Sequence, residues 1–527
     1  MSAQRHWTSV CALADILPGT GVCARVERQQ VAIFLVGDAT HAIGNYDPGS
    51  GANVLSRGIV GDQGGEIVVA SPIYKQHYSL ITGQCLEEAD LRVSVYPTRI
   101  VAGDVWVRNQ PLSLQRRPGK RRLVVVGSGV AAMRVIEGLL ERTPHSYDIT
   151  VFGAEAHSAY NRVLLTPLLA GDKRLEDVVT HPPEWFEQAG IVFHRGDRVV
   201  RIDRLRRVVH SECGVQQPYD RLVLATGSTA VVLPVPGREL NGVVTFRDLA
   251  DVDTMLRATT QFKRATVIGG GVLGLEAASA LQRRGMQVTV IHHGGLLMNR
   301  QLDAAAAELL KSALSAQGLR FQMNATVSAF LGEDRVTGVR LTDGTEQATD
   351  LVVLAVGTQP NTTLANQAGL RCDRGILVDD TLQTFDPAIY AVGECVQHRD
   401  STYGLVAPLS EQANVCAAHL AEQGRVRYLG STVFTQLKVA GLEVFSTGNY
   451  QGGEGTEALV LRDLKRGVYK RLVLKNNRVT GAVLYGDTAD GQWYFDLIRE
   501  GRDITPLRDR LMFGASACST VPSSAVQ

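Results

Sequence analysis

The sequence predicts an α/β protein in which a small all-β domain precedes, and a small α+β domain follows, two strand–turn–helix units. Three observations lead to this prediction. An apolar strand, a Gly-rich turn and a helix occur twice, in "RRLVVVGSGVAAMRVIEGLL" and in "RATVIGGGVLGLEAASALQRRG". Short β segments fill the first 109 residues, and alternating strands return beyond about residue 430. A chain of 527 residues is long enough for several such domains.

The charge and the two ends of the chain exclude some classes of partner. A net charge of +1 gives no general attraction to nucleic acid or to an acidic membrane surface. The basic run "RRPGKRR" lies between two patterned regions, so we interpret it as a solvated linker. The start, "MSAQRHWTSV", lacks the apolar core of a signal peptide, and no apolar stretch is long enough to span a bilayer. We therefore expect neither a nucleic-acid nor a membrane partner.

The eight cysteines are scattered, without CxxC or CxxxxC spacing. This spacing argues against a zinc knuckle, a redox-active disulfide and an all-Cys iron–sulfur cluster. Unpaired cysteines in a chain of this size suggest a reducing compartment, so we expect a cytoplasmic protein.

The first domain is predicted from four β segments separated by Gly, Asp and Asn. They are "QQVAIFLV", "GEIVVASP", "LRVSVYPTRIV" and "DVWVRN". Helical periodicity is weak throughout this region, which favours an all-β domain.

The first strand–turn–helix unit has the pattern of a dinucleotide site. Gly127, Ser128 and Gly129 form the turn, with Ala132 in the third small position. Such a turn lets a pyrophosphate approach the backbone at the start of a helix. A second strand, in "DITVFGAE", ends near Glu155, where a carboxylate can hold ribose hydroxyls.

The second unit carries a complete GxGxxG, formed by Gly269, Gly271 and Gly274, with Glu276 in the helix that follows. The next strand, "QVTVIHH", has His292 where an NAD-selective enzyme usually has Asp or Glu. A neutral imidazole can still bond a ribose 2′-hydroxyl, and a protonated one would tolerate a 2′-phosphate. The alternative, that His292 is merely exposed, stays open. We expect loose selectivity that leans to NADH.

Three further segments link the two units. "LVLATGS" (222–228) and "LVVLAVGTQPN" (351–361) are apolar strands that end in Gly, as in connections between an FAD domain and an inserted NAD domain. "IYAVGEC" places an acid after another strand, where it can bond the ribityl chain of a flavin. The residues involved are Thr226, Gly227, Gly357, Gly393 and Glu394.

In this order the motifs resemble the two-dinucleotide flavoprotein reductases, which include ferredoxin and rubredoxin reductases. Residues 122–425 are most similar to the N-terminal half of the large subunits of assimilatory NAD(P)H nitrite reductases, in "AYNRVLLTPLLAG", "LMNRQLD" and "YGLVAP". "YKRLVL" and "GAVLYGD" resemble the domain that follows there. Residues 6–109 resemble the Rieske-like small subunit of those enzymes, in "DILPGTGVCA", "VLSRGI" and "ASPIYKQ". The chain thus resembles a small subunit fused to a shortened large one.

The resemblance also locates the cluster-ligand positions of a Rieske domain, and none of them can hold iron. "NYDPGSG" offers Asp47 and Gly49 where Cys and His would stand, and "ASPIYKQHYSLITGQC" offers Ser71 and Tyr74. A Rieske centre needs two thiolates and two imidazoles. We therefore expect no metal site, and we interpret the first domain as a docking or assembly module. The alternative, a structural relic that only stabilises the flavoprotein, stays open.

The resemblance implies an FAD-dependent NAD(P)H oxidoreductase that passes electrons to the catalytic subunit of an assimilatory nitrate or nitrite reductase. Arg162 would pair with the FAD pyrophosphate, and no side chain is expected to act as a general acid or base. No cysteine-rich or sirohaem segment follows "LMFG" (511–514), so the chain alone should not reduce nitrite. Two alternatives stay open: a stand-alone reductase of a rubredoxin- or ferredoxin-like iron–sulfur carrier, and a redox-sensing scaffold.

The expected domain boundaries follow the changes in pattern along the chain. We expect a Rieske-like β domain at 1–109, a basic linker at 110–121, an FAD-binding domain at 122–242 and 351–425, an NAD(P)H-binding domain at 243–350, an α+β domain at 426–514 and a disordered tail at 515–527.

Overall fold

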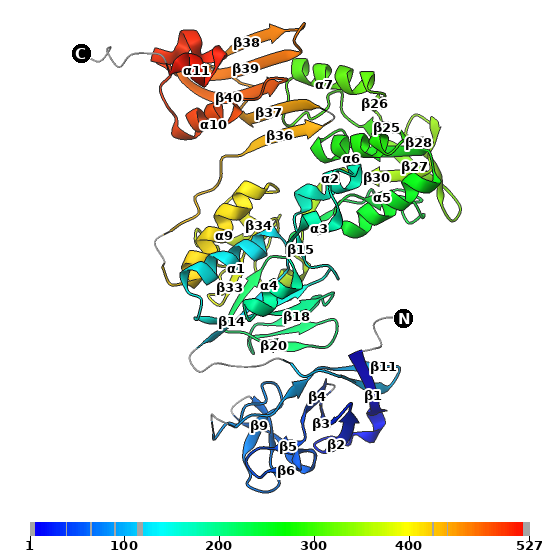
Figure 1. Ribbon diagram of the computed structural model, residues 1–527, viewed down its shortest axis with the longest axis vertical. Helices are drawn as coiled ribbons and strands as arrows, with labels where there is room; N and C mark the ends of the chain where they lie inside the picture. The colour runs from blue at the N-terminus through cyan, green and yellow to red at the C-terminus, as the bar shows by residue number, and fades with distance from the viewer. Residues whose placement is uncertain are drawn as a thin grey trace, which may run out of the picture.

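The computed structural model describes residues 6–37, 39–63, 66–88, 91–112, 120–423, 426–439 and 441–519. Most of the expected linker (113–119) and the end of the expected tail (520–527) lie outside the described residues. Figure 1 shows an elongated molecule, with the N-terminal β module at one end and the C-terminal module at the other. Among the described residues no helix is both long and apolar enough to cross a membrane.

The N-terminal module is all-β, as predicted. Four strands form one sheet in the order β10 (Val95–Tyr96), β4 (Ala39–Gly44), β3 (Gln29–Val36) and β2 (Gly21–Val26). A second sheet has the order β1 (Trp7–Ala12), β12 (Asp104–Arg108) and β11 (Thr98–Val101). Two smaller pieces follow: the hairpin of β5 (Tyr46–Asp47) with β6 (Ala52–Asn53), and the sheet of β7 (Ile59–Gln63), β8 (Glu66–Ala70) and β9 (His77–Ser79). Phe34, Ile43, Leu55 and Tyr78 are fully buried in its core.

The first dinucleotide unit is a parallel sheet in the order β17 (Val192–Arg195), β14 (Tyr147–Gly153), β13 (Arg121–Val126), β21 (Arg221–Leu224) and β33 (Ile389–Ala391). The run Leu123–Val125 is fully buried, as a strand covered on both faces requires. Helices α1 (Val130–Arg142) and α9 (Val406–Leu420) pack side by side against it (Figure 1).

The second unit repeats this arrangement in the order β23 (Val243–Thr245), β30 (Leu351–Leu354), β24 (Arg264–Ile268), β25 (Gln287–His292) and β26 (Arg320–Met323). Its helices include α5 (Leu249–Gln261), α6 (Val272–Arg283) and α7 (Ala304–Ala316). Two strands connect the units and pair antiparallel: β22 (Ser228–Ala230) and β31 (Thr358–Pro360). This insertion of one α/β unit into another is the fold that the sequence predicted.

The C-terminal module is an antiparallel sheet covered by helices. The strand order is β36 (Phe434–Val439), β37 (Leu442–Gly448), β40 (Arg478–Tyr485), β39 (Val468–Lys475) and β38 (Glu457–Asp463), followed by α10 (Gly491–Glu500) and the 3-10 helix η5 (Thr505–Phe513). The expected disorder from Ala515 is wrong for the first residues of the tail. They form α11 (Ala515–Cys518), because the Ala515 N–H donates to Asp490 Oδ1 at 3.0 Å and Cys518 is buried.

The N-terminal module rests on a small sheet of the first dinucleotide unit, formed by β18 (Val199–Asp203), β19 (Val208–Ser211) and β20 (Gln216–Pro218). The two backbones touch closely here: a Cβ on Gly214, whose φ is +85°, would lie 2.1 Å from the carbonyl oxygen of Thr98. The β5–β6 hairpin lies at the opposite, outer end of the module (Figure 1).

Candidate functional site

The first glycine loop forms an open cradle at the start of α1. Gly127 has φ +114°, and a Cβ there would lie 2.1 Å from the carbonyl oxygen of Ala225, so only glycine fits. Gly129 is the N-cap of α1, no side chain caps the helix, and a Cβ on Gly129 would meet no atom within 4 Å. Ala132 is fully buried, and Ser128 lies over the end of β14. Unpartnered N–H groups beside open space suit a pyrophosphate.

Two predicted residues meet at the end of β14. The carboxylate of Glu155 accepts hydrogen bonds from the Tyr160 hydroxyl at 2.6 Å and from Arg162 Nη2 at 2.5 Å. Arg162 Nη1 donates to the carbonyl oxygen of Arg247 at 2.7 Å. The structure therefore pairs the predicted ribose acid with the predicted pyrophosphate arginine.

Arg247 is a residue of this site that the sequence did not reveal. Its guanidinium forms an ion pair with Glu394 and donates to Ser228 Oγ at 2.9 Å, and Ser228 Oγ in turn donates to Glu394 Oε2 at 2.7 Å. The Arg247 N–H donates to Asp251 Oδ2 at 2.7 Å, in the first turn of α5. Arg247 thus connects the acid predicted to face the ribityl chain with the first helix of the inserted unit. In "FRDLADVD" nothing marks this arginine, because the partners of its guanidinium, Ser228 and Glu394, are 19 and 147 positions away.

Hydrogen bonds join the ends of the two connecting strands near Glu394. Thr226 Oγ1 donates to the Asn361 carbonyl oxygen at 3.0 Å, and Asn361 Nδ2 donates to the Thr226 carbonyl oxygen at 2.8 Å. Gly227 and Gly357 have φ of +64° and +116°, and a Cβ on either would meet no atom within 4 Å. Gly393, with φ +91°, packs on α1. These glycines leave an open face where both units meet.

The second glycine loop repeats the geometry of the first. A Cβ on Gly269, whose φ is +121°, would lie 2.2 Å from the carbonyl oxygen of Ala355. A Cβ on Gly274 would lie 2.0 Å from the carbonyl oxygen of Gly269, so the helix packs directly on the loop. Gly271 is the N-cap of α6, with no side-chain cap and open space before it. This is a second cradle for a pyrophosphate.

His292 has a different environment from the one that a ribose contact needs. Its Nδ1 accepts the Gly270 N–H at 3.2 Å, and its Nε2 lies 3.1 Å from the Leu296 carbonyl oxygen, to which it donates. The side chain is buried, and burial, together with the neighbouring His293, lowers its pKa. Both ring nitrogens are used, so the predicted bond to a 2′-hydroxyl requires one of these contacts to open.

Glu276 connects the two units from α6. Its Oε2 lies 3.1 Å from Thr166 Oγ1, which is on α2 (Leu165–Ala170) of the first unit, and α2 packs on α6. Burial raises the pKa of the Glu276 carboxyl, and the hydrogen bond from Thr166 only partly offsets this rise. Glu276 therefore joins the two units, and its contact with a bound dinucleotide stays a prediction.

Comparison with known proteins identifies this arrangement. Residues 121–419, more than half of the chain, match the family described as pyridine nucleotide-disulphide oxidoreductase. The chain belongs to this family. It is an FAD-dependent NAD(P)H oxidoreductase, and the two cradles fit FAD and NAD(P)H. Residues 6–108 match a Rieske-like [2Fe-2S] domain, and residues 434–502 match the C-terminal domain of rubredoxin NAD+ reductase.

Relatives of this reductase support the predicted resemblance. Nitrite reductase [NAD(P)H] of Bacillus subtilis strain 168 is 46% identical over 387 residues, which cover 73% of this chain and 48% of the relative. The assimilatory nitrate reductase electron transfer subunit of the same organism is 39% identical, over 75% of this chain and 51% of the relative. The chain thus spans about half the length of these relatives. A ferredoxin reductase from Rhodopseudomonas palustris has the same fold, with a TM-score of 0.65, 26% identity and coverage of 73% of this chain and all of the other.

The Rieske-like module of this reductase does not fit an iron–sulfur cluster. Asp47 is fully buried, and its carboxylate accepts hydrogen bonds from the hydroxyls of Ser71, Tyr78 and Ser50 and from the Gly49 N–H. Tyr74, at the last ligand position, is 65% exposed. His77, which lies nearby, pairs with Glu87 at 2.6 Å. Side-chain hydrogen bonds to Asp47 join the two loops that carry the cluster-ligand positions, so the residues present do not fit a [2Fe-2S] cluster.

Proposed function

We propose that this reductase oxidises NADH or NADPH and passes the electrons to the catalytic subunit of an assimilatory nitrate or nitrite reductase. The observation that carries the proposal is the presence of two open glycine cradles on one chain, fused to a Rieske-like module whose ligand positions hold no Cys or His. Redox chemistry therefore rests on the dinucleotides. The names of the two Bacillus relatives support this acceptor class.

When bound, FAD supplies hydride acceptance and the release of single electrons. The residues of the chain bind the two dinucleotides and orient their reactive rings. In this proposal the N–H groups at the start of α1 and of α6 hold the two pyrophosphates, as helix N-termini favour anions. Glu155 and Glu394 accept hydrogen bonds from the hydroxyl groups of the ribose and of the ribityl chain, while Arg162 and Arg247 balance the charge of the two carboxylates.

A second acceptor class stays open because residues 434–502 match the C-terminal domain of rubredoxin NAD+ reductase. In this version a rubredoxin- or ferredoxin-like iron–sulfur carrier takes the electrons. We favour the nitrate or nitrite reductase partner because the two Bacillus relatives are named for these activities. The eight cysteines are all unpaired, which supports action in the reducing cytoplasm.

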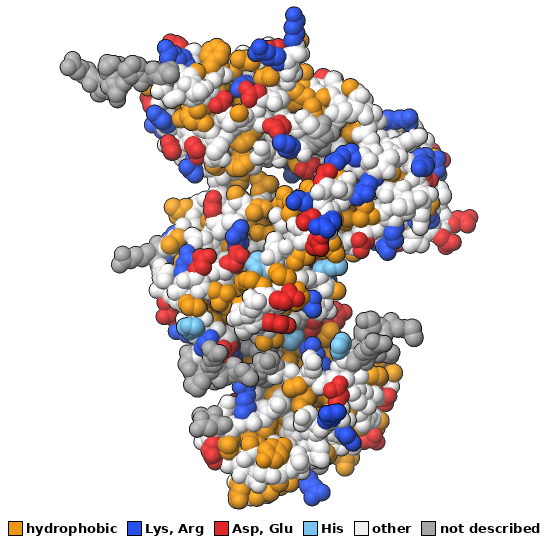
Figure 2. Space-filling view, in the orientation of Figure 1, with side chains coloured by type: hydrophobic (Ala, Val, Ile, Leu, Met, Phe, Trp, Pro, Cys, Tyr) orange, Lys and Arg blue, Asp and Glu red, His pale blue; other side chains and the backbone are white. Residues whose placement is uncertain are grey.

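The Rieske-like module acts in this proposal as a docking module. Its outer end carries exposed apolar side chains on the two ligand loops: Tyr46 is 52%, Ile73 46% and Tyr74 65% exposed. Figure 2 shows hydrophobic side chains gathered on the same end of the molecule. Aromatic residues of this kind often anchor protein interfaces. The end that carries them is opposite to the contact with the reductase units (Figure 1), so the module would tether a partner rather than conduct electrons.

The test uses the purified, FAD-loaded chain and the catalytic subunit of a nitrate or nitrite reductase. We expect NADH to reduce ferricyanide through this chain alone, and nitrate or nitrite only when the catalytic subunit is added. A parallel assay offers rubredoxin. Faster reduction of rubredoxin than of the catalytic subunit would favour the carrier reductase, and nitrite consumption by the metal-free chain alone would refute the proposed division of roles.

A further inference from the structure

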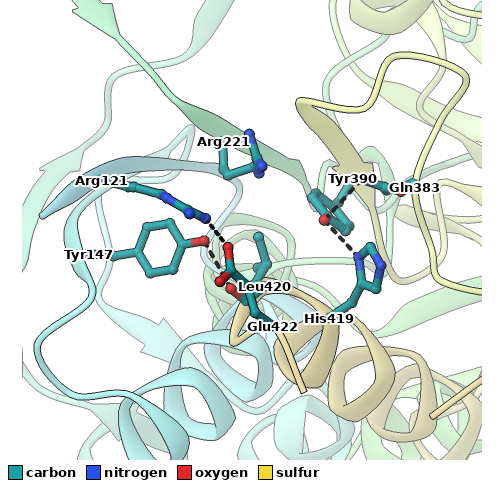
Figure 3. Close-up of a pocket in the computed structure, with 8 residues that line it drawn as sticks. All are labelled: Arg121, Tyr147, Arg221, Gln383, Tyr390, His419, Leu420 and Glu422. Atoms are coloured by element: carbon teal, nitrogen blue, oxygen red, sulfur yellow. Dashed lines mark hydrogen bonds and ion pairs between the residues drawn. The ribbon is translucent and has the colours of Figure 1, made fainter. Parts of the chain in front are cut away.

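A pocket lies at the edge of the first parallel sheet that is opposite to its dinucleotide cradle. It is a cavity of about 310 Å³ lined by Arg121, Tyr147, Arg221, Gln383, Tyr390, His419, Leu420 and Glu422 (Figure 3). Arg121, Tyr147 and Arg221 stand at the amino ends of β13, β14 and β21, whereas nucleotides bind at the carboxyl ends of such strands. The volume is within the range of small-molecule sites. This pocket therefore belongs to neither dinucleotide.

The lining of this pocket is rich in donors and poor in acceptors. Register places the two arginines on neighbouring strands, since Arg221 pairs with Leu123, two residues after Arg121. Arg121 forms an ion pair with Glu422 at 2.5 Å. Among the described residues Arg221 forms no ion pair, and its Nη1 donates a hydrogen bond to the Asp220 carbonyl oxygen at 3.0 Å. A half-buried guanidinium without a carboxylate is a strong attractor for an oxyanion.

The far wall is held in a fixed arrangement. Gln383 Nε2 donates to the Tyr390 hydroxyl at 3.0 Å, which leaves that hydroxyl to donate to His419 Nδ1 at 2.8 Å. The second phenol, of Tyr147, donates to the Leu420 carbonyl oxygen at 2.9 Å. Burial lowers the pKa of His419, and the charges of Arg427 and Arg221 add to this effect. The imidazole is thus neutral, with Nδ1 as acceptor and Nε2–H as a further donor.

Glu422 shows which kind of group the pocket binds. It directly follows the C-cap of α9, a position where glycine is common because the backbone turns left-handed there, and its φ is +61°. A Glu at this position has a strained, left-handed backbone conformation, and its carboxylate contacts Arg121 (Figure 3). The chain thus supplies an internal carboxylate to one of the two guanidinium groups and leaves the other open.

From these contacts we propose that the pocket binds a small organic oxyanion, a phosphate monoester or a polycarboxylate, between Arg221 and Arg121, in competition with the Glu422 carboxylate. Such a ligand accepts hydrogen bonds from both guanidinium groups and fits between the two phenols. The site is separate from the flavin and nicotinamide chemistry, so ligand binding and NADH oxidation can be measured independently.

The test is calorimetric titration of the FAD-loaded full chain with inorganic phosphate and, separately, with citrate, with saturating NAD+ present to fill the second cradle. We expect Arg221→Gln to weaken the binding of the preferred anion by about tenfold or more, the loss of one charge-assisted bond. Glu422→Gly should tighten it severalfold, because it removes both the competing carboxylate and the strained backbone. Arg257→Gln, an exposed arginine on α5, is the matched control.

The two titrations, with phosphate and with citrate, distinguish the possible ligand classes. Preference for phosphate or for citrate assigns the ligand to the phosphate or the carboxylate class. FAD content and the NADH–ferricyanide rate report whether each variant is folded. Absence of heat for both anions would overturn the proposal. So would equal affinities in the wild type, Arg221→Gln and Glu422→Gly, because the anion would then bind elsewhere.

Discussion

The hydroxyl of Ser71 donates a hydrogen bond of 2.6 Å to the carboxylate of Asp47, and the Rieske resemblance assigns these two positions to the cysteine ligands of a cluster. A direct contact between the two ligand loops thus takes the place of a metal bridge. Tyr78 and Ser50 donate to the same carboxylate at 2.7 Å each. These hydrogen bonds hold the two loops together, which explains how the Rieske-like fold is kept although the cluster ligands are absent from its ligand positions.

We expect Asp47→Ala to destabilise the Rieske-like module by about 3 kcal/mol, because two buried hydroxyls lose their acceptor. Burial raises the pKa of Asp47, but the hydrogen bonds outweigh it, so the pKa in the folded state is lowered. The stabilisation is therefore present above the ordinary Asp pKa of about 3.9 and is lost as the pH falls below it through the lowered value. Hydrogen exchange of peptides spanning 45–80 measures the effect. Asp104→Ala, an exposed acid of the same module, should leave exchange unchanged.

Arg247→Gln should weaken FAD binding by about 10- to 100-fold, the range expected for losing a charge-assisted hydrogen bond. The change leaves Glu394 with Ser228 as its remaining side-chain donor and removes the guanidinium that forms an ion pair with this carboxylate. Flavin fluorescence during titration of the apoprotein gives the Kd. Arg238→Gln removes an exposed ion pair with Glu239 and is the control. Equal FAD affinity in both variants would exclude a role for Arg247 at the flavin.

His292→Glu should raise the preference for NADH over NADPH in kcat/KM. A carboxylate can still accept the Gly270 N–H, and it repels a 2′-phosphate. Because burial and His293 lower the pKa of His292, the imidazole stays neutral at neutral pH. The wild-type ratio should therefore stay flat between about pH 6.5 and 8, a range above the ordinary imidazole pKa of about 6.5. A ratio that shifts towards NADPH on acidification would contradict a neutral His292.

The sequence predicted the parts of this fold that depend on local pattern. The run "QQVAIFLV" is β3 residue for residue, and α1 and α6 both begin directly after the predicted glycine turns. The prediction of disorder was wrong for the start of the tail. Its Ser/Ala-rich composition suggests disorder, but the contact of Ala515 with Asp490 and the burial of Cys518 order its first residues. Arg247 was missed for a similar reason: its partner Glu394 is 147 positions away, and no local pattern reports such a pair.

The Rieske-like module carries two exposed tyrosines on its outer end. Tyr46 and Tyr74 lie on the two loops joined by Asp47 and Ser71, and both rings are mostly exposed. If this surface binds the acceptor enzyme, the double change Tyr46→Ser with Tyr74→Ser should lower NADH-driven electron delivery to the catalytic subunit at low protein concentration. The ferricyanide rate should not change, because neither residue touches the dinucleotide cradles.

The matched control changes an exposed apolar residue elsewhere, Leu464→Ser on the C-terminal module, which is 64% exposed. A chain that lacks residues 1–119 should behave like the double variant, with intact dye reduction and reduced delivery. The loss should shrink as protein concentration rises, since tethering acts by raising the effective concentration of the partner. Undiminished delivery by a well-folded double variant at every concentration would mean that the closed ligand loops serve only to stabilise the module.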